Sequence, residues 1–374
     1  MHIAHLITRL ELGGAQRNTL LSCAAQAAAG HAVTLLAGAG GMLDGEAAAL
    51  PGVTFIPLPE LVHPLNLPAD WRALRALTAR LRALRPELVH THSSKAGILG
   101  REAAAAAGVP LAVHTVHGWS FNDAQPAWRR ELYVMLERRA ARVTRALICV
   151  SAADRAAGLA RGIGTAGCYR IIRSGIDWAA PRAAIARRAA TRAALGVPDG
   201  QALVLMTACL KPQKNPLAFV ALARAMPDAL FLLAGDGDLR PQVERAAAGL
   251  GDRFRLPGWR QDIPDLVAAA DALVLTSRWE GLPRAAVEAV AAGTPAVVTD
   301  TGGVRDIIDG DNGALVPVDD GAALAARLRA VLDWPRDPAA RQARADAAQA
   351  KYAGEFALPA MHARLLALYA ELRS

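Results

Sequence analysis

The stretch TSRWEGLPRAAVEAVAAGTP, residues 276–295, carries two glutamates, Glu280 and Glu288, separated by seven residues. Glu280 follows an apolar run at residues 272–276 that we expect to form a buried strand, and Glu288 lies near the start of the next helix. Pro283 is tolerated in the first turn of that helix. Because a carboxylate only accepts hydrogen bonds, each glutamate is suited to hold a sugar hydroxyl or a vicinal diol. The alternative is a pair of ordinary surface glutamates.

Short apolar runs alternate with alanine-rich helical stretches on both sides of this segment. Such alternation is typical of repeated β-α units and predicts an α/β fold with two doubly wound parallel-sheet domains. In doubly wound folds, ligands bind at the carboxyl ends of the strands, so we expect the active site in a cleft that both domains face. The expected strands are residues 2–8, 32–37, 53–58, 88–91, 111–115, 146–150, 169–172, 202–207, 230–234, 272–276, 296–299 and 314–318.

The chain has 374 residues, which fits two large domains at about 150 residues each. We expect a first domain over residues 1–176 and a second over residues 201–352. An irregular stretch rich in arginine and alanine, residues 177–200, is expected to link them. Residues 353–374 are expected to form a C-terminal helix that crosses back to the first domain.

The composition narrows the cellular compartment and the classes of binding partner that we expect for this protein. Hydrophobic residues make up 53% of the chain and charged residues 20%, which excludes global disorder. The formal net charge of +8 favours anionic partners. No zinc-finger spacing or aromatic-rich RNA-recognition pattern accompanies the basic residues, so we expect no nucleic acid. Four cysteines without metal-ligand or disulfide-scaffold spacing favour a reducing cytoplasm, and the absence of an apolar stretch of about 18 residues predicts no membrane-spanning helix.

The stretch at residues 276–295 resembles the Glu-x7-Glu motif of the retaining family-4 glycosyltransferases, whose fold is the two-domain GT-B architecture. Other segments resemble motifs of the same family, in the family's order, over nearly the whole chain. These are ITRLELGGAQ at 7–16, HTHSSKAG at 90–97, VHTVHG at 113–118, SGID at 174–177, KPQKNP at 211–216, LAGDGDL at 233–239, GWRQDI at 258–263 and TGGV at 301–304. The junction SGID departs from the family's Asn-Gly-Ile-Asp by its serine.

The resemblance implies roles for residues that would face the sugar. It implies that Glu288 holds the ribose hydroxyls of the nucleotide and that Glu280 holds a hydroxyl of the transferred sugar. His117, at the end of an expected strand, would touch that sugar from the first domain; a lone histidine is otherwise more often a structural residue. His92, Ser94 and Lys95 are weaker candidates for contact with the acceptor.

The resemblance also implies which cations meet the donor diphosphate. Lys214 matches the lysine that performs this role in the family. The family commonly has an arginine where this chain has Cys209, so one expected positive charge is missing. Lys211 is a candidate substitute, and the alternative for either lysine is a solvated surface charge.

Two glycine pairs have a physical role apart from the resemblance. Gly13 and Gly14 lie between an expected strand and helix, where the backbone can approach a phosphate and helix-end N–H groups can bind it. Gly302 and Gly303 are expected to do the same in the second domain, unless each pair is an ordinary tight turn. With these donors for the phosphates, we expect no metal and no cofactor; the nucleotide sugar is a substrate.

These observations predict a retaining, metal-independent transfer of a hexosyl or N-acetylhexosaminyl group from a nucleotide-diphosphate sugar to a glycan or lipid-linked acceptor. The family analogy places such a reaction in bacterial exopolysaccharide or lipopolysaccharide assembly. Two alternatives stay open: a sugar-nucleotide epimerase on the same fold, and a catalytically silent, membrane-associated binding protein.

Two expected helices of the first domain are basic and amphipathic. Residues 71–85 carry five arginines around a leucine stripe, and a second basic run begins at Trp128. Helices of this kind can rest on anionic lipid, which would place the protein on the inner face of the cytoplasmic membrane. Alternatively, each stripe packs on the protein's own sheet.

Overall fold

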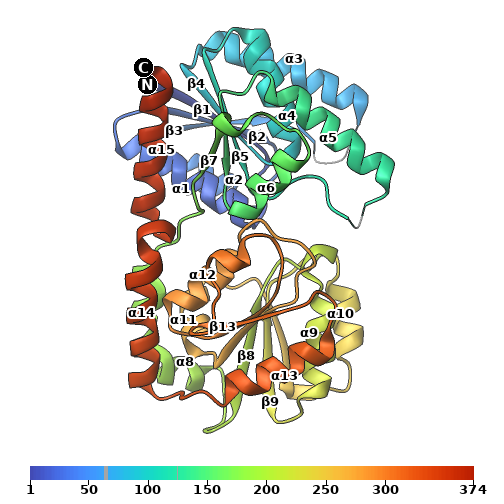
Figure 1. The fold of residues 1–374 in the computed structure, drawn as a ribbon, viewed down its shortest axis with the longest axis vertical. Helices are drawn as coiled ribbons and strands as arrows, with labels where there is room; N and C mark the ends of the chain where they lie inside the picture. Colours follow the sequence, from blue (N-terminus) through green and yellow to red (C-terminus); the bar gives the residue numbers. More distant parts are fainter. Residues whose placement is uncertain (63–65, 124) are drawn as a thin grey trace. The chain divides into compact units, whose positions relative to one another are not determined.

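The computed structural model describes residues 1–62, 66–123 and 125–374. The chain divides into two compact units (Figure 1). Unit 1 comprises Met1–Ser174 together with Met361–Ser374, and unit 2 comprises Gly175–Ala360. Each unit is built on an open, entirely parallel sheet. This confirms the predicted α/β class with two doubly wound domains.

The sheet of unit 1 has seven strands in the order β3-β2-β1-β4-β5-β6-β7. Their bounds are β1 (His2–Arg9), β2 (Ala32–Gly38), β3 (Val53–Leu58), β4 (Leu88–His92), β5 (Leu111–Val116), β6 (Ala146–Cys149) and β7 (Tyr169–Ile171). The chain leaves β1 towards one edge and returns at β4 on the other side of β1. The strand order therefore reverses between β1 and β4, where doubly wound folds bind ligands.

Helices cover both faces of this sheet because its strands alternate between two apolar clusters. Ala4 and Leu6 of β1 pack with the cluster under α3 and α4, whereas Ile7 packs with the cluster under α1. The helices are α1 (Gly14–Ala28), α2 (Asp44–Ala48), α3 (Leu67–Leu84), α4 (Ser94–Ala107), α5 (Ala127–Ala141), α6 (Ala152–Ala160) and the short η1 (Ala166–Cys168). In the described part of the chain, no helix combines the length and apolarity needed to cross a membrane.

The sheet of unit 2 has six strands in the order β10-β9-β8-β11-β12-β13. Their bounds are β8 (Ala202–Thr207), β9 (Ala229–Ala234), β10 (Phe254–Gly258), β11 (Ala272–Leu275), β12 (Ala296–Thr299) and β13 (Gly313–Val316). The order reverses between β8 and β11, so the loops that follow these two strands are neighbours at the carboxyl edge. Strand β10 was not expected from the sequence, because it is short and contains Pro257, which only an edge strand tolerates.

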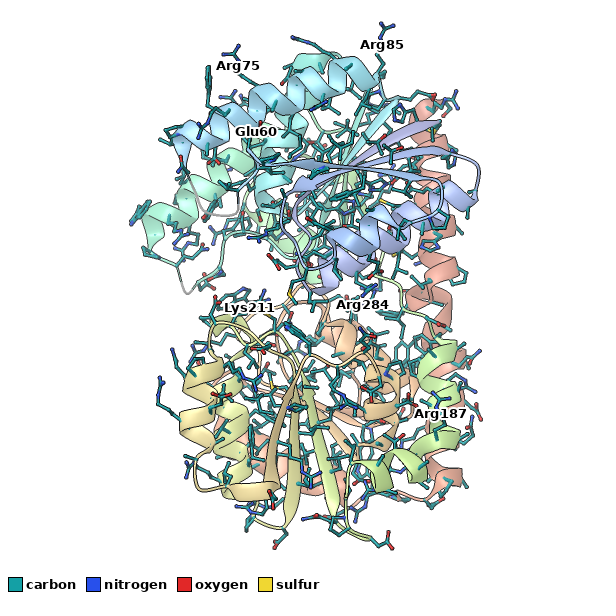
Figure 2. The ribbon with its side chains drawn as sticks, turned by 180° about the vertical axis from the view of Figure 1, so that it is seen from behind. Glu60, Arg75, Arg85, Arg187, Lys211 and Arg284 are labelled. Carbon is teal, nitrogen blue, oxygen red and sulfur yellow. The ribbon has the colours of Figure 1, made fainter. Side chains whose placement is uncertain are left out.

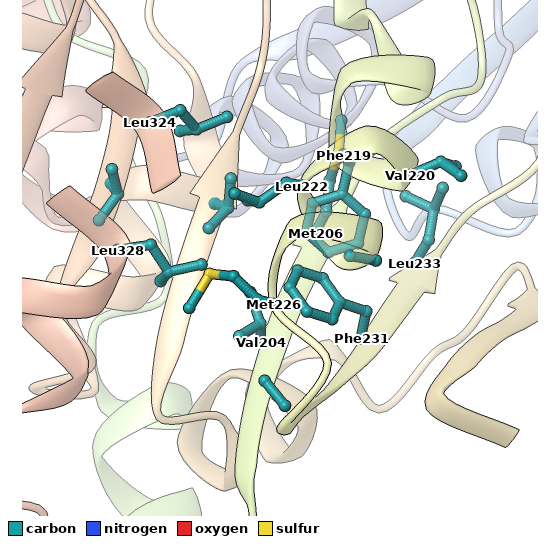
Figure 3. Packing of buried hydrophobic residues seen from close by; sticks show 14 of the residues in the cluster. Val204, Met206, Phe219, Val220, Leu222, Met226, Phe231, Leu233, Leu324 and Leu328 are labelled. Carbon is teal, nitrogen blue, oxygen red and sulfur yellow. The ribbon is translucent and has the colours of Figure 1, made fainter. Parts of the chain in front are cut away.

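A single large apolar cluster joins the sheet of unit 2 to α9 and α13 (Figure 3). Phe219 of α9 and Phe231 of β9 pack edge to face with ring centroids 5.2 Å apart. The helices of the unit are α7 (Ala179–Ala184), η2 (Ile185–Arg187), α8 (Arg188–Ala194), η3 (Pro212–Lys214), α9 (Pro216–Ala225), α10 (Arg240–Ala247), η4 (Gly251–Arg253), α11 (Ile263–Ala269), α12 (Arg284–Ala291), η5 (Gly302–Asp306), α13 (Gly321–Leu332) and α14 (Pro338–Phe356).

The stretch expected as a linker, residues 177–200, is instead helical and lies within unit 2. Arg188 and Arg192 of α8 lie 2.5 and 3.0 Å from the carboxylate oxygens of the buried Asp271. Arg188 also donates to the last carbonyls of α11. The arginines that gave this stretch its irregular appearance therefore bind it to the second sheet.

The last helix, α15 (Leu358–Arg373), follows α14, and from Met361 onward its residues belong to unit 1. Arg170 pairs with Glu371 at 2.5 Å, and the Tyr369 hydroxyl lies 2.5 Å from His90 Nδ1. Unit 1 is therefore completed by the last residues of the chain.

Candidate active site

The Glu280 side chain lies in the loop between β11 and α12 and is 7% exposed. The Ser277 hydroxyl donates to Glu280 Oε1 at 2.6 Å, and Lys214 Nζ donates to the same oxygen at 2.5 Å. Lys214 is 20% exposed. The two residues expected to bind different parts of a donor are therefore ion-paired with each other.

The loop that carries Lys214 is tied to the loop that carries Glu280 by further hydrogen bonds. Gln213 Nε2 donates to the Trp279 carbonyl at 2.9 Å, and the Arg278 N–H donates to the Gln213 carbonyl at 2.8 Å. The Thr276 hydroxyl lies 3.0 Å from the Lys214 carbonyl oxygen. These contacts hold the lysine and the carboxylate in a fixed relation at the carboxyl ends of β8 and β11.

Gly302 and Gly303 support the Glu280 loop. Gly302 has a φ of +54°, and a Cβ there would lie 1.9 Å from the Glu280 carbonyl oxygen, so only glycine fits. The Gly303 N–H donates to the Gly281 carbonyl at 2.6 Å. This differs from the expectation that the Gly303 N–H faces a phosphate, because this N–H already donates to the neighbouring loop.

Glu288 lies on α12 with its side chain 23% exposed. Burial raises the pKa of its carboxyl, and the nearby Arg284 guanidinium opposes that rise. Arg284 Nη2 is 3.9 Å from Glu288 Oε1, and Arg284 Nη1 donates to the Gly175 carbonyl at 2.5 Å. Arg284 was not expected from the sequence, although its spacing of four residues from Glu288 was a usable signal.

Lys211, the candidate substitute for the arginine missing at Cys209, lies just before η3 and is exposed. Figure 2 shows Lys211 and Arg284 at the same end of unit 2. Among the described residues, Lys211 has no carboxylate within salt-bridge distance, in contrast to Lys214. Its ammonium group is therefore available to an anion at the surface.

In unit 1, helix α1 begins directly after β1 and presents an uncapped N-terminus. Gly13 and Gly14 are both exposed, Gly13 contributes no side-chain cap, and the first turn contains no acidic residue. The first N–H groups of a helix without such partners attract anions, and the helix dipole adds to that attraction. The N-terminus of α1 therefore stays a candidate for binding an anion.

His117 follows the last residue of β5 and packs against His92, the last residue of β4. His92 Nδ1 and His117 Nε2 are 3.1 Å apart, and the rings stack with centroids separated by 5.4 Å. Lys95, which follows Ser94 at the start of α4, is mostly buried and donates to Asp70 Oδ1 at 2.6 Å. An acceptor that reached Lys95 would have to compete with Asp70, a partner that the sequence did not indicate.

His5, His90 and His92 form a group in which one ligand atom of each lies within 4.8 Å of the others. All three side chains are buried. Every ring nitrogen of the three lies within 3.1 Å of a polar protein atom. A metal would have to displace these hydrogen bonds, so the group does not fit a metal centre.

Comparison with known proteins and family models assigns this chain to a family. Residues 12–179 match the model for Glycosyltransferase Family 4, and residues 204–333 match the model for Glycosyl transferases group 1. The UDP-Gal:alpha-D-GlcNAc-diphosphoundecaprenol alpha-1,3-galactosyltransferase of Escherichia coli is 34% identical over 273 residues, which are 70% of each chain. The chain belongs to the retaining family-4 glycosyltransferases.

This glycosyltransferase has the GT-B fold, as predicted. It is similar to Anabaena Alr3699/HepE in complex with UDP-glucose, with a TM-score of 0.83, 22% identity, and coverage of 99% of this chain and 100% of that chain. It is also similar to the sucrose-phosphate synthase (tll1590) from Thermosynechococcus elongatus, with a TM-score of 0.84, 23% identity, and coverage of 100% and 99%. At these identities the likeness concerns the fold alone.

Proposed function

We propose that this glycosyltransferase moves a hexosyl or N-acetylhexosaminyl group from a nucleoside-diphosphate sugar to a hydroxyl of a glycan or lipid-linked acceptor, in cell-surface polysaccharide or lipopolysaccharide assembly. The observation that carries the proposal is the ion pair of Lys214 and Glu280, held between the loops after β8 and β11. The Escherichia coli relative supports the substrate classes, since its name gives a UDP-sugar donor and a diphosphoundecaprenol-linked acceptor.

The pair of Lys214 and Glu280 is suited to respond to a donor. A bound diphosphate competes with Glu280 for the Lys214 ammonium, and the carboxylate keeps its hydrogen bond from Ser277 when it loses the lysine. Glu280 then accepts a hydrogen bond from a sugar hydroxyl, while Lys214 stabilises the charge that grows on the leaving diphosphate. Lys211 and the N-terminus of α1 are further candidates for contact with that diphosphate.

Glu288 is assigned to the ribose. An ionised carboxylate can accept hydrogen bonds from both ribose hydroxyls, whereas a protonated one loses part of that capacity. Burial disfavours ionisation of Glu288, and the Arg284 guanidinium at 3.9 Å counteracts this effect. Arg284 therefore helps to keep Glu288 charged, and it fixes the start of α12 through its bond to Gly175.

Retention of configuration follows from attack on the face that the diphosphate leaves. The bond from the anomeric carbon to the phosphate oxygen breaks, the bond to the acceptor oxygen forms, and the acceptor's proton passes to the leaving phosphate. Glu280 acts by binding the sugar and not as a nucleophile. Protein cations and helix-end N–H groups supply the positive charge, so we expect turnover without a divalent metal or another cofactor.

Peripheral attachment to an anionic membrane on the cytoplasmic side is part of the proposal. Two tryptophans on the basic helices of unit 1 are exposed, Trp71 of α3 by 58% and Trp128 of α5 by 71%. Arg75 lies over the Trp71 ring at 4.7 Å. Exposed indole rings beside arginines are suited to the lipid headgroup region.

The test is product analysis by mass spectrometry with UDP-galactose, UDP-glucose and UDP-N-acetylglucosamine, each with and without a polyprenyl-diphosphate GlcNAc acceptor and with EDTA. The proposal expects a glycosylated acceptor in the presence of EDTA. A donor that changes its sugar without any acceptor would instead identify an epimerase. No turnover with any pair, combined with vesicle binding, would identify a silent membrane-associated protein, and loss of turnover in EDTA alone would refute metal independence.

A further inference from the structure

A chain of hydrogen bonds runs through the interior of unit 1 from Gln26 to His117. Gln26 Oε1 lies 2.7 Å from His5 Nε2, His5 Nδ1 lies 3.0 Å from His92 Nε2, and His92 Nδ1 lies 3.1 Å from His117 Nε2. We call these four residues the histidine chain. Gln26, His5 and His92 are fully or almost fully buried. The chain forms because β1, β4 and β5 are adjacent strands and α1 covers β1.

The histidine chain has a direction because its inner members are neutral. Burial lowers the pKa of His5 to about 4 and holds the pKa of His92 well below its ordinary value. A neutral imidazole has one N–H and one lone pair, so the first hydrogen bond fixes every later one. The Gln26 carbonyl oxygen accepts from His5 Nε2–H, His5 Nδ1 accepts from His92 Nε2–H, and His92 Nδ1 accepts from His117 Nε2–H. In this arrangement His117 carries its proton on Nε2 and its lone pair on Nδ1.

A second series of bonds begins at the amide nitrogen of Gln26. Gln26 Nε2 donates to the Tyr369 hydroxyl at 3.2 Å, and that hydroxyl donates to His90 Nδ1 at 2.5 Å. His90 Nε2–H then donates to the Thr115 hydroxyl at 2.7 Å. Burial raises the pKa of Tyr369, which keeps its hydroxyl protonated. Rotation of the Gln26 amide by half a turn would reverse both series together, so one side chain determines both directions.

We propose that Gln26 is a positioning residue that holds His117, through His5 and His92, in the tautomer with its proton on Nε2 and its lone pair on Nδ1. This inference rests on the proposed function, in which His117 faces the donor sugar. A sugar hydroxyl that meets His117 Nδ1 must then donate a hydrogen bond, because this nitrogen has no proton to give. Gln26, at the buried end of the histidine chain, thereby determines that the sugar must offer a hydrogen-bond donor to His117.

The direct test is nitrogen-15 NMR of the full-length protein with labelled histidine at pH 8, where free imidazoles are neutral. The nine histidines are assigned by single substitutions. In the wild-type protein we expect a protonated Nε2 and an unprotonated Nδ1 for His5, His92 and His117. Gln26→Met keeps the length of the side chain and removes both polar atoms, so it should give His117 a mixture of tautomers.

Thr115→Val is the matched control. It removes a buried hydrogen-bond partner from the end of the second series and leaves the histidine chain complete. His117 should keep its single tautomer in this variant. UDP contains no sugar beyond the ribose, so its affinity should be unchanged in both variants, which also reports that each is folded. Donor turnover, measured as kcat/KM, should fall about tenfold in Gln26→Met only, the effect of one misdirected hydrogen bond.

Three results would overturn the inference. They are an unprotonated Nε2 on His117 in the wild-type protein, an unchanged His117 tautomer in Gln26→Met, and unchanged turnover in a Gln26→Met protein whose tautomer has shifted. Failure of the proposed function is distinguishable from these results. It would appear as an absence of wild-type turnover with every nucleotide sugar, whereas the tautomer measurement requires no substrate.

Discussion

Replacing Glu280 with glutamine should tighten the binding of UDP while it slows sugar transfer. Lys214 Nζ is 2.5 Å from Glu280 Oε1 in a largely buried pair, so the carboxylate competes with a diphosphate for the lysine. Hydrogen bonds to charged groups contribute about 1.5–3 kcal/mol, roughly twice the contribution of neutral ones. A neutral amide therefore removes about 1 kcal/mol of competition, which corresponds to UDP binding about fivefold tighter. Transfer slows because the amide is a weaker acceptor for the sugar hydroxyl.

The opposite change, Lys214→Met, should weaken UDP binding by about 10- to 100-fold, because the diphosphate loses a charged partner. In the Lys214→Met background, Glu280→Gln should no longer tighten UDP binding, since the competition concerns this lysine alone. Isothermal titration calorimetry with UDP on the wild type, both single variants and the double variant, all in EDTA, measures the coupling.

Glu244→Gln is the control for this cycle. Glu244 pairs with Arg240 on the exposed surface of α10, so the substitution makes the same change in net charge away from the Lys214 loop. UDP affinity should stay within about twofold of the wild-type value. The reasoning is refuted if Glu280→Gln weakens UDP binding, or if it tightens UDP binding equally when Lys214 is absent.

Three further predictions concern other parts of the molecule. Burial raises the pKa of Glu288 above its ordinary value of 4.5, so ionisation of this carboxyl at higher pH lowers the free energy of unfolding. Denaturant unfolding should therefore show Glu288→Gln to be more stable than the wild type at pH 7 but not at pH 4. The same variant should bind UDP more weakly. Gly302→Ala would place a Cβ 1.9 Å from a carbonyl oxygen at a positive φ. It should lower the free energy of unfolding by about 3 kcal/mol and abolish turnover. Gly310→Ala, with open space around its Cβ, should change neither the stability nor the turnover. The double variant Trp71→Ser and Trp128→Ser should co-sediment severalfold less with phosphatidylglycerol vesicles and keep its UDP affinity. Equal vesicle binding by the wild type and this variant would contradict the membrane proposal.

The local pattern of the sequence was sufficient for most of the fold. Buried parallel strands are continuous apolar runs, and this explains why the core strands of both sheets were found. Strand β10 lacked that pattern, since Arg255 and Pro257 interrupt a run of five residues. The helices within residues 177–200 were missed because the residue that binds them lies far along the sequence. It is the buried Asp271, which pairs with Arg188 and Arg192.

The sequence indicated the candidate site residues one by one but not the contacts between them. Family motifs indicated Lys214 and Glu280 separately, and their ion pair spans 66 positions of sequence. Such a contact exists only because β8 and β11 are neighbours in the sheet. The histidine chain has the same origin, since His5 and His92 meet through the register of β1 and β4. Motifs indicate candidate residues, whereas the partners of these residues depend on strand order.

The return of the last helix to unit 1 has a consequence for synthesis on the ribosome. When residue 174 has left the exit tunnel, the nascent first unit still lacks Met361–Ser374 and therefore the hydroxyl of Tyr369. Until residue 369 has been synthesised, Gln26 and His90 lack the Tyr369 hydroxyl as a hydrogen-bond partner. The Gln26 amide therefore gains this partner only after the segment Met361–Ser374 has packed onto the rest of unit 1.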